Sequence, residues 1–355
     1  MSSCKRWVLG FLLVWILLLS VFGGFTVLID PFFHYHEPLE GLQYPINNER
    51  YQNDGIVKHF DYDAIITGSS MTENFKTSEF DQLFGCNSIK VPYSGGTFKE
   101  VNDNLATALK YNPDVKLILR VVDYSSFEMD KDSMFEDIIG SFPYYLYDNL
   151  IFNDVEYIFN KTVFFNASCN VLEYTREGGM TTSFDEYSNW NDEAVFGKEA
   201  VDSIYQRIDR NPEMMPVTEE DYAVIRENIS QNFTDLIAQH PDVQFYLFFA
   251  PHSIYYWDAQ YLHGTIEKQL AEEKYVIELL LEYDNVHLFS FLNEYDIVCN
   301  IDNYMDVWHY NEDINSQLLV WMSEGEHELT KDNYLEYCEE MHDFYMNYDY
   351  DALFE

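Results

Sequence analysis

An uninterrupted apolar run near the N-terminus constrains this chain more than any other feature. From Trp7 to Ile29 the sequence reads WVLGFLLVWILLLSVFGGFTVLI, which is 23 residues without a charged side chain. As a helix this run would be roughly 35 Å long, enough to cross the hydrocarbon core of a bilayer. A cleaved signal peptide is the competing interpretation, but the run is long for one and no Ala-x-Ala-like site follows it. The sequence therefore predicts an uncleaved transmembrane anchor at 7–29.

The charges beside this run predict its orientation. Lys5 and Arg6 precede it, whereas the flank that follows, DPFFHYHEPLE, contains neither Lys nor Arg. Cytoplasmic flanks of membrane spans carry an excess of basic residues. We therefore expect a cytoplasmic N-terminus at 1–6 and a single-pass protein of the cell membrane, with nearly the whole chain outside the cytoplasm and the lipid bilayer as one partner.

The overall charge excludes one large class of partner. Lys and Arg total 20 against 62 Asp and Glu, a formal net charge of -42. A polyanionic nucleic acid would be repelled by such a chain, so nucleic acid is not expected as a partner.

The cysteines allow disulfides but give no indication of a metal or redox centre, because they form no Cys-x-x-Cys pair. Cys4 falls on the cytoplasmic side, and the other four would lie in a compartment that can be oxidising. Two disulfides are possible, and the sequence does not choose among the three pairings of Cys86, Cys169, Cys299 and Cys338. No cofactor is expected.

Five short apolar runs alternate with amphipathic stretches, which is the pattern of strands interleaved with helices. Their near-continuous apolar character is typical of strands covered on both faces. With right-handed crossovers, the simplest winding is a three-layer, flavodoxin-like α/β domain with a mainly parallel sheet, spanning 61–322. The expected strands are at 63–68, 87–92, 115–123, 243–251 and 285–291.

Helices are expected at 98–113, from Thr218 to Pro241, and from Tyr261 to Tyr283. Three other segments depart from the alternation. Residues 30–60 are expected to be a linker that packs on the domain, 124–217 an aromatic-rich insertion over the functional edge of the sheet or a separate small domain, and 323–355 an acidic, helical tail.

The first candidate site lies where a predicted strand stops. The run AIIT ends at Gly68 and is followed by Ser69 and Ser70. In isolation, Gly-Ser-Ser is more simply a turn. At the carboxyl edge of a parallel sheet, however, Ser70 would be presented where open α/β folds bind ligands. A serine there reacts only with a base within hydrogen-bond reach and a third group that orients the base.

Late in the chain, NYMDVWHYNEDIN places Asp306 three residues before His309, so the carboxylate can hold the imidazole of its near neighbour. The third requirement is an oxyanion hole of backbone N–H groups. PYSGGTF, after the second strand, supplies Gly95 and Gly96, which with the N–H of Ser70 are the predicted donors.

These blocks, in this order, resemble the SGNH (GDSL-like) hydrolase superfamily. The resemblance covers roughly residues 60–322. The Gly-Ser-Ser variant with an N-terminal anchor is similar to the membrane-anchored, extracytoplasmic branch that includes the acyl-transfer protein of teichoic-acid D-alanylation. It implies that Ser70 is the nucleophile, His309 the base and Asp306 its orienter. It also implies a serine esterase or O-acyltransferase acting on acylated cell-envelope glycans or polymers, and it admits a membrane-bound acyl-transfer partner.

One block departs from the family pattern. Where the family places an Asn after the third strand as an oxyanion donor, this chain has Asp123. An ionised Asp would oppose a developing oxyanion, so either Asp123 has another role or the hole rests on backbone donors and Asn74. With Ser69 and His252, these two residues are the predicted pocket residues. The departure keeps open an alternative from another class, a non-catalytic SGNH-fold scaffold or glycan-binding envelope protein.

Overall fold

The computed structural model describes residues 3–134, 142–211 and 213–354. Contacts divide the chain into two compact units, one made of 1–60 with 141–183 and the other of 61–140 with 184–355. The stretch 124–217, expected to be one insertion, is thus divided between the two units.

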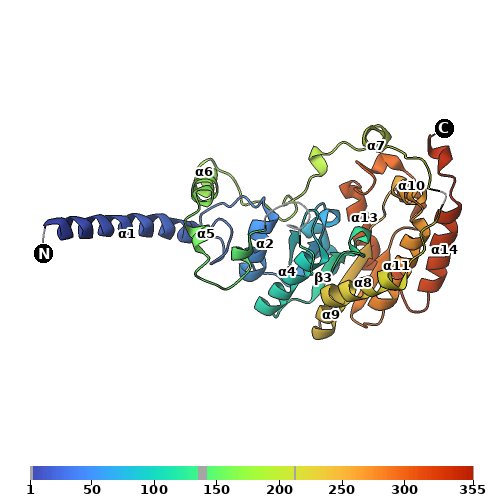
Figure 1. Cartoon of the computed structure of the whole chain (residues 1–355), viewed down its shortest axis with the longest axis horizontal. Helices are drawn as coiled ribbons and strands as arrows, with labels where there is room; N and C mark the ends of the chain where they lie inside the picture. The colour runs from blue at the N-terminus through green and yellow to red at the C-terminus, as the bar shows by residue number, and fades with distance from the viewer. Residues whose placement is uncertain (1–2, 135–141, 212, 355) are drawn as a thin grey trace. The chain divides into compact units, whose positions relative to one another are not determined.

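The smaller unit begins with one long apolar helix, as the sequence predicts. Helix α1 runs from Ser3 to Ile29 and is long and apolar enough to cross a membrane or to serve as a signal sequence. Shorter helices lie beside its carboxyl end (Figure 1). The remaining elements are α2 (Glu49–His59), the 3-10 turn η4 (Tyr144–Leu146), α5 (Val155–Ile158), the π-helical turn η5 (Val163–Ser168) and α6 (Cys169–Arg176).

Helix α2 lies in the segment 30–60, which was expected to be a linker. Its buried residues include Gln52, Asn53 and Asp54, so burial does not follow hydrophobicity in this helix. Gln52 can be buried because its side-chain amide donates to the carbonyl oxygens of Pro31 and Pro45 at 3.2 and 3.1 Å. Polar groups that are hydrogen-bonded in this way can be buried at low cost. Because the buried positions of α2 are partly polar, a search for periodic apolar residues does not detect this helix.

The larger unit is built on a six-stranded, mostly parallel sheet in the order β2-β1-β3-β4-β5-β6. The expected mixed α/β architecture is confirmed, and each of the five predicted strands forms within the expected range. A sixth, antiparallel strand of two residues was not predicted. The strands are β1 (Ala64–Gly68), β2 (Ser88–Pro92), β3 (Leu117–Val121), β4 (Gln244–Phe249), β5 (Val286–Ser290) and β6 (Glu328–Leu329).

Every residue of β1 and β2 is buried, so the sheet is covered on both faces at these strands. Helix α3 packs against α13. Helix α11 contacts both α8 and α14, as Figure 1 shows. The longer helices of this unit are α3 (Thr77–Phe84), α4 (Phe98–Tyr111), α8 (Glu219–Ile229), α10 (Ile254–His263), α11 (Ile266–Leu280), α13 (Glu312–Glu324) and α14 (Tyr334–Asn347).

The short elements are η1 (Ser70–Thr72), η2 (Tyr124–Ser126), η6 (Asn191–Glu193), α7 (Lys198–Ile204), the π-helical turn η7 (Ser230–Thr234), α9 (Asp235–Gln239), α12 (Tyr295–Val298), η8 (Ile301–Asn303) and η9 (Asp351–Phe354).

Local signals set several helix boundaries. Thr97 and Thr218 start α4 and α8 with capping boxes, in which each threonine accepts from the third residue of its helix. The single helix expected from Tyr261 to Tyr283 is wrong, because Gly264 adopts a left-handed φ of 74° and ends α10 before α11 begins.

The tail 323–355 contains the end of α13, the strand β6 and helix α14, which packs against α11. All five cysteines lie among the described residues and carry free thiols, so neither of the two possible disulfides is formed.

Candidate active site

The strand β1 stops at Gly68 for a steric reason. Its φ is 144°, and a Cβ there would lie 2.6 Å from a methyl group of Val121 on the neighbouring strand. Only glycine fits this position. Ser69 then caps the 3-10 turn η1, with its Oγ accepting the N–H of Met71 at 3.3 Å. The turn presents Ser70 as its first residue, two positions beyond the end of β1.

The second part of the site is the loop 303–311, which precedes α13. Tyr304 and Tyr310 form an isolated antiparallel bridge that closes the base of the loop. Asp306 lies inside this loop, and its Oδ1 accepts the backbone N–H groups of Trp308 and His309 at 2.7 and 2.8 Å. The tight turn that results brings the carboxylate against the side chain of His309.

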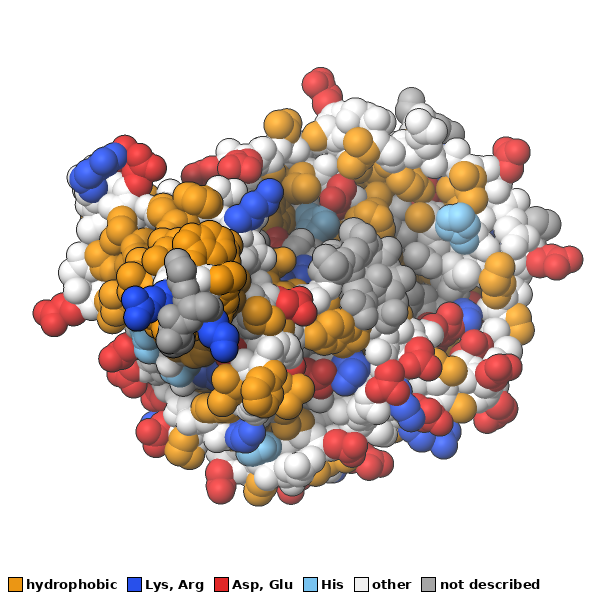
Figure 2. All heavy atoms as spheres, turned by 60° about the vertical axis from the view of Figure 1, so that its left-hand side comes forward, with side chains coloured by type: hydrophobic (Ala, Val, Ile, Leu, Met, Phe, Trp, Pro, Cys, Tyr) orange, Lys and Arg blue, Asp and Glu red, His pale blue; other side chains and the backbone are white. Residues whose placement is uncertain are grey.

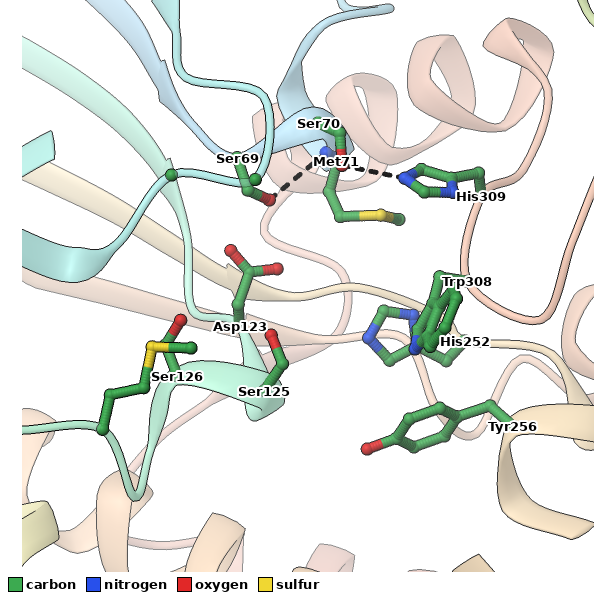
Figure 3. Close-up of a pocket in the computed structure, with 13 residues that line it drawn as sticks. Ser69, Ser70, Met71, Asp123, Ser125, Ser126, His252, Tyr256, Trp308 and His309 are labelled. Atoms are coloured by element: carbon green, nitrogen blue, oxygen red, sulfur yellow. Dashed lines mark hydrogen bonds between the residues drawn. The ribbon is translucent and has the colours of Figure 1, made fainter. Parts of the chain in front are cut away.

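Ser70, His309 and Asp306 form a continuous chain of hydrogen bonds, of which Figure 3 shows the bond between Ser70 and His309. The Oγ of Ser70 is 2.8 Å from Nε2 of His309, whose Nδ1 is 2.6 Å from Oδ2 of Asp306. The amide of Asn315 on α13 donates to the carbonyl oxygen of Met71 at 3.3 Å, which ties the serine turn to the helix that follows the histidine loop. This is the geometry of a serine activated by an oriented base.

The carboxylate of the chain is held in its ionised form. Burial opposes ionisation of Asp306, but the hydrogen bonds from the His309 side chain and from backbone N–H groups outweigh it and lower the pKa of the carboxyl below its usual value. An ionised Asp306 fixes the proton of His309 on Nδ1 and leaves Nε2 free to accept one from the serine.

Asn74 is not a pocket residue, so that prediction is wrong. Its side chain is buried and its Oδ1 accepts the backbone N–H of Trp190 at 3.1 Å. The indole of Trp190 in turn meets the imidazole of His309 edge to face, with 5.5 Å between ring centroids. Asn74 therefore supports an aromatic wall of His309, and no sequence signal connected the two.

The glycines after β2 divide into two cases. The N–H of Gly96 donates to the carbonyl oxygen of Tyr93 at 2.7 Å, and a Cβ there would lie 2.5 Å from the Cβ of Tyr93. Gly96 is thus required by the turn, and its N–H is not an available oxyanion donor, contrary to prediction. The N–H groups of Ser70 and Gly95 donate to no other group in the part of the chain that the structure describes.

Asp123 follows β3 and faces the same pocket, with its carboxyl directed toward Ser69 (Figure 3). Burial raises the pKa of this carboxyl to about 6, although a hydrogen bond from Ser69 and the charge of Arg120 partly oppose the rise. Near neutral pH Asp123 is therefore divided between a charged and a neutral form. The neutral form carries an O–H that can donate, as an Asn amide would.

Ser70, His309, Gly95 and Asp123 line a cavity of about 210 Å³. His252 is buried in its wall with Nδ1 unpaired among the described residues, and burial lowers the pKa of its imidazole to about 4. It is therefore a neutral polar group in the wall of the cavity. Six lining residues were not predicted, although one follows Ser70 directly and two lie in the turn that follows Asp123; they are Met71, Ser125, Ser126, Met129, Tyr256 and Trp308.

One cluster in the described part of the larger unit has the geometry of a metal site. Carboxylate oxygens of Glu128, Asp221 and Glu272 lie within 4.8 Å of one another. The ammonium of Lys268 pairs with all three carboxylates. Because an internal cation already occupies the cluster, and burial together with Glu128 raises the pKa of Glu272 to about 8, these residues do not indicate a metal centre.

The sequence matches no protein-family model and no curated protein. Among solved structures, the chain is similar to a protein provisionally described as a platelet activating factor, from Streptococcus pneumonia. The two share 11% identity and a TM-score of 0.39, and the match covers 77% of this chain and 88% of the other. A likeness this distant carries no functional argument, so the function rests on the geometry of the site.

Proposed function

We propose that this protein is a membrane-anchored serine esterase or O-acyltransferase with an SGNH-like fold, acting outside the cytoplasm on acyl esters. The observation that carries the proposal is the pair of short hydrogen bonds that joins Ser70, His309 and Asp306 at the rim of a cavity. The strand order β2-β1-β3-β4-β5 is that of doubly wound, flavodoxin-like sheets and supports the fold assignment.

The mechanism follows from the direction of each hydrogen bond. Ser70 Oγ attacks an acyl carbonyl carbon while His309 Nε2 takes the serine proton, and Asp306 stabilises the imidazolium that forms. The N–H groups of Ser70 and Gly95 bind the oxyanion. His309 then returns the proton to the departing alkoxide, which leaves an acyl-serine. Water or a hydroxyl acceptor, deprotonated by His309, takes the acyl group in the second half.

The size and setting of the cavity narrow the substrate. A volume of about 210 Å³ is smaller than a typical drug-sized ligand pocket and suits a short acyl group. Trp308, nearly half exposed beside it, offers a flat surface on which a sugar ring can stack. Together with an apolar N-terminal helix, these features favour acylated cell-envelope glycans or polymers, with a membrane-bound acyl-transfer partner when the acceptor is not water.

One observation favours a second candidate, a non-catalytic scaffold or glycan-binding protein. Asp123 places a carboxyl in the cavity, and its charged form would oppose an oxyanion. The scaffold hypothesis explains this residue directly, but it gives no reason for the oriented Ser70 and His309.

The two candidates are separated by labelling the full chain in detergent with a fluorophosphonate probe. We expect wild type to be labelled, and Ser70→Ala and His309→Ala to be labelled at background level. Ser203→Ala is the matched control, because this serine is exposed on α7 and does not line the cavity; it should still be labelled. Absence of labelling in folded wild type would favour the scaffold.

A further inference from the structure

The smaller unit exposes a group of large apolar side chains that its own fold does not cover. They lie on α5 and on the turns that flank it. Phe152 is 98% exposed and Ile151 81%, although burial of such side chains is favourable. Clustered exposure of this kind marks an interaction surface. The 150–165 face consists of Leu150, Ile151, Phe152, Val155, Phe159 and Phe165.

This face is continuous with the apolar helix α1. The ring of Phe22 on α1 stacks on Phe164, with 4.0 Å between centroids, and on Phe159 at 6.4 Å. Next to it, Gly23 allows a close approach, since a Cβ there would lie 2.7 Å from a methyl group of Ile158. Helix α5 and η5 therefore pack directly on the last turns of α1.

The position of these contacts along α1 indicates a depth. A bilayer core takes roughly 20 helical residues. Counted from Trp7, at the basic end of the helix, the core extends close to Thr26. Phe22 then lies inside the core, and its partners Phe159 and Phe164 share that depth. Figure 2, in which α1 points toward the viewer, shows hydrophobic side chains around this helix and basic side chains near its tip.

The opposite side of α5 is buried, with Tyr157 in an apolar cluster beside Leu146 and Val163, and it is hydrogen-bonded to the chain that follows α1. The hydroxyl of Tyr157 donates to Asp30 at 2.7 Å, and the hydroxyl of Tyr35 donates to Asp154 at 2.9 Å. These bonds hold Tyr157 inward, so the exposed apolar side chains face away from the unit. Apolar side chains placed in this way beside a membrane span can enter the lipid by about 5–10 Å, as those of interfacial helices do.

We propose that the 150–165 face inserts into the outer leaflet of the bilayer beside α1, where lipid acyl chains cover it. This inference rests on α1 being a retained membrane helix. Retention is supported by the end of α1 being part of the fold, because Thr26 and Ile29 are buried and the hydroxyl of Tyr44 donates to the carbonyl of Ile29 at 2.8 Å. Cleavage before this point would remove part of the unit.

The test uses tryptophan fluorescence of the full chain reconstituted in phosphatidylcholine vesicles. Phe152→Trp adds an indole at a position without packing partners, so the fold is not perturbed. Tyr111→Trp, at a half-exposed position on α4, is the matched control. The fluorescence that each variant adds over wild type is measured with brominated acyl chains and, separately, with aqueous iodide. We expect F152W to be quenched by brominated lipid at least several-fold more than Y111W, and Y111W to be quenched more by iodide.

Three results would overturn the proposal, and they are distinguishable. Iodide quenching of F152W equal to that of Y111W would place the face in water. Protection of F152W from both quenchers would mean that protein covers it, such as a second copy of this chain. Trp7 and Trp15 of wild type lie on α1. If brominated lipid does not quench wild type, α1 is not inserted, and both the membrane anchor and the insertion of the 150–165 face are contradicted. The proposed esterase is tested separately, by fluorophosphonate labelling of Ile151→Ser/Phe152→Ser, which should match wild type.

Discussion

The Oγ of Ser70 lies 2.8 Å from Nε2 of His309, although 239 residues separate them in the chain. The serine is placed by a strand end that only glycine can form, and the histidine by a loop closed by a pair of tyrosines. Ser70 and His309 are each fixed by the local backbone structure, so the contact between them does not require a flexible side chain to change conformation.

Removing the charge behind His309 should slow the reaction without dismantling the site. In Asp306→Asn the amide no longer stabilises the imidazolium and can favour the wrong tautomer, so we expect kcat to fall about 10³- to 10⁴-fold. The measurement is the hydrolysis of a p-nitrophenyl acetate ester by the full chain. Asp313→Asn, an exposed change on α13, is the control and should stay within about twofold of wild type. An unchanged kcat in D306N would exclude the proposed role of Asp306 in orienting and stabilising His309.

The carboxyl of Asp123 should make the activity dependent on pH. Because burial raises its pKa to about 6, it is mainly charged above that pH and opposes the oxyanion, whereas the neutral form below it can donate. Asp123→Asn mimics the neutral form at every pH. We therefore expect kcat/KM of the variant to exceed that of wild type several-fold at pH 8 and to approach it at pH 5.

Full pH profiles of both proteins check this, and the transition near pH 6 assigned to Asp123 should disappear in D123N. A loss of activity at every pH would show instead that the reaction needs the carboxylate itself.

Burial of Glu273 on α11 should make folding stability fall as pH rises. Burial raises its pKa from 4.5 to about 7, and the hydrogen bond from Tyr337 only partly opposes this. A raised pKa means that the folded state holds the proton more tightly. The stability it contributes is complete below about pH 4.5 and is lost as pH rises through 7. The loss is on the order of 3 kcal/mol.

Urea unfolding at pH 5 and pH 9 measures this effect. Glu273→Gln keeps an acceptor for Tyr337 but cannot ionise, so its stability should depend less on pH than that of wild type. Glu278→Gln, exposed on the same helix, should keep the wild-type dependence. Equal pH dependence in both variants would contradict the assignment to Glu273.

A methyl group at Gly68 should damage both the fold and the site. Gly68→Ala forces a Cβ to within 2.6 Å of Val121 at a φ that L residues rarely adopt. Gly85→Ala is a matched control, since Gly85 also has a positive φ, 69°, but its Cβ would meet no atom within 4 Å. Both variants should lose stability to backbone strain, and overpacking should cost Gly68→Ala about 1–3 kcal/mol more.

Thermal unfolding and fluorophosphonate labelling of the two variants check this. Only Gly68→Ala should lose labelling, because only it moves the turn that carries Ser70. A labelled Gly68→Ala protein would mean that the turn does not depend on its glycine.

The sequence by itself determined the features that depend on near neighbours. The apolar run 7–29 predicts one long helix because hydrophobicity and length are properties of the segment alone. The five buried strands could be predicted for the same reason, since their β-branched and aromatic runs are bounded by turn residues. The pairing of Asp306 with His309 could also be expected, because three residues separate them and one turn brings them together.

Only the tertiary structure decided what each backbone and side-chain polar group is used for. Gly96 was expected to donate to a substrate, but its N–H donates to the carbonyl oxygen of Tyr93 within the turn. Asn74 was expected in the pocket, but it holds Trp190 behind the histidine. Hydrogen bonds of this kind join groups from separate segments once they are buried, where an unpaired group is costly. Their partners are chosen by packing across the fold, which no local pattern of residues records.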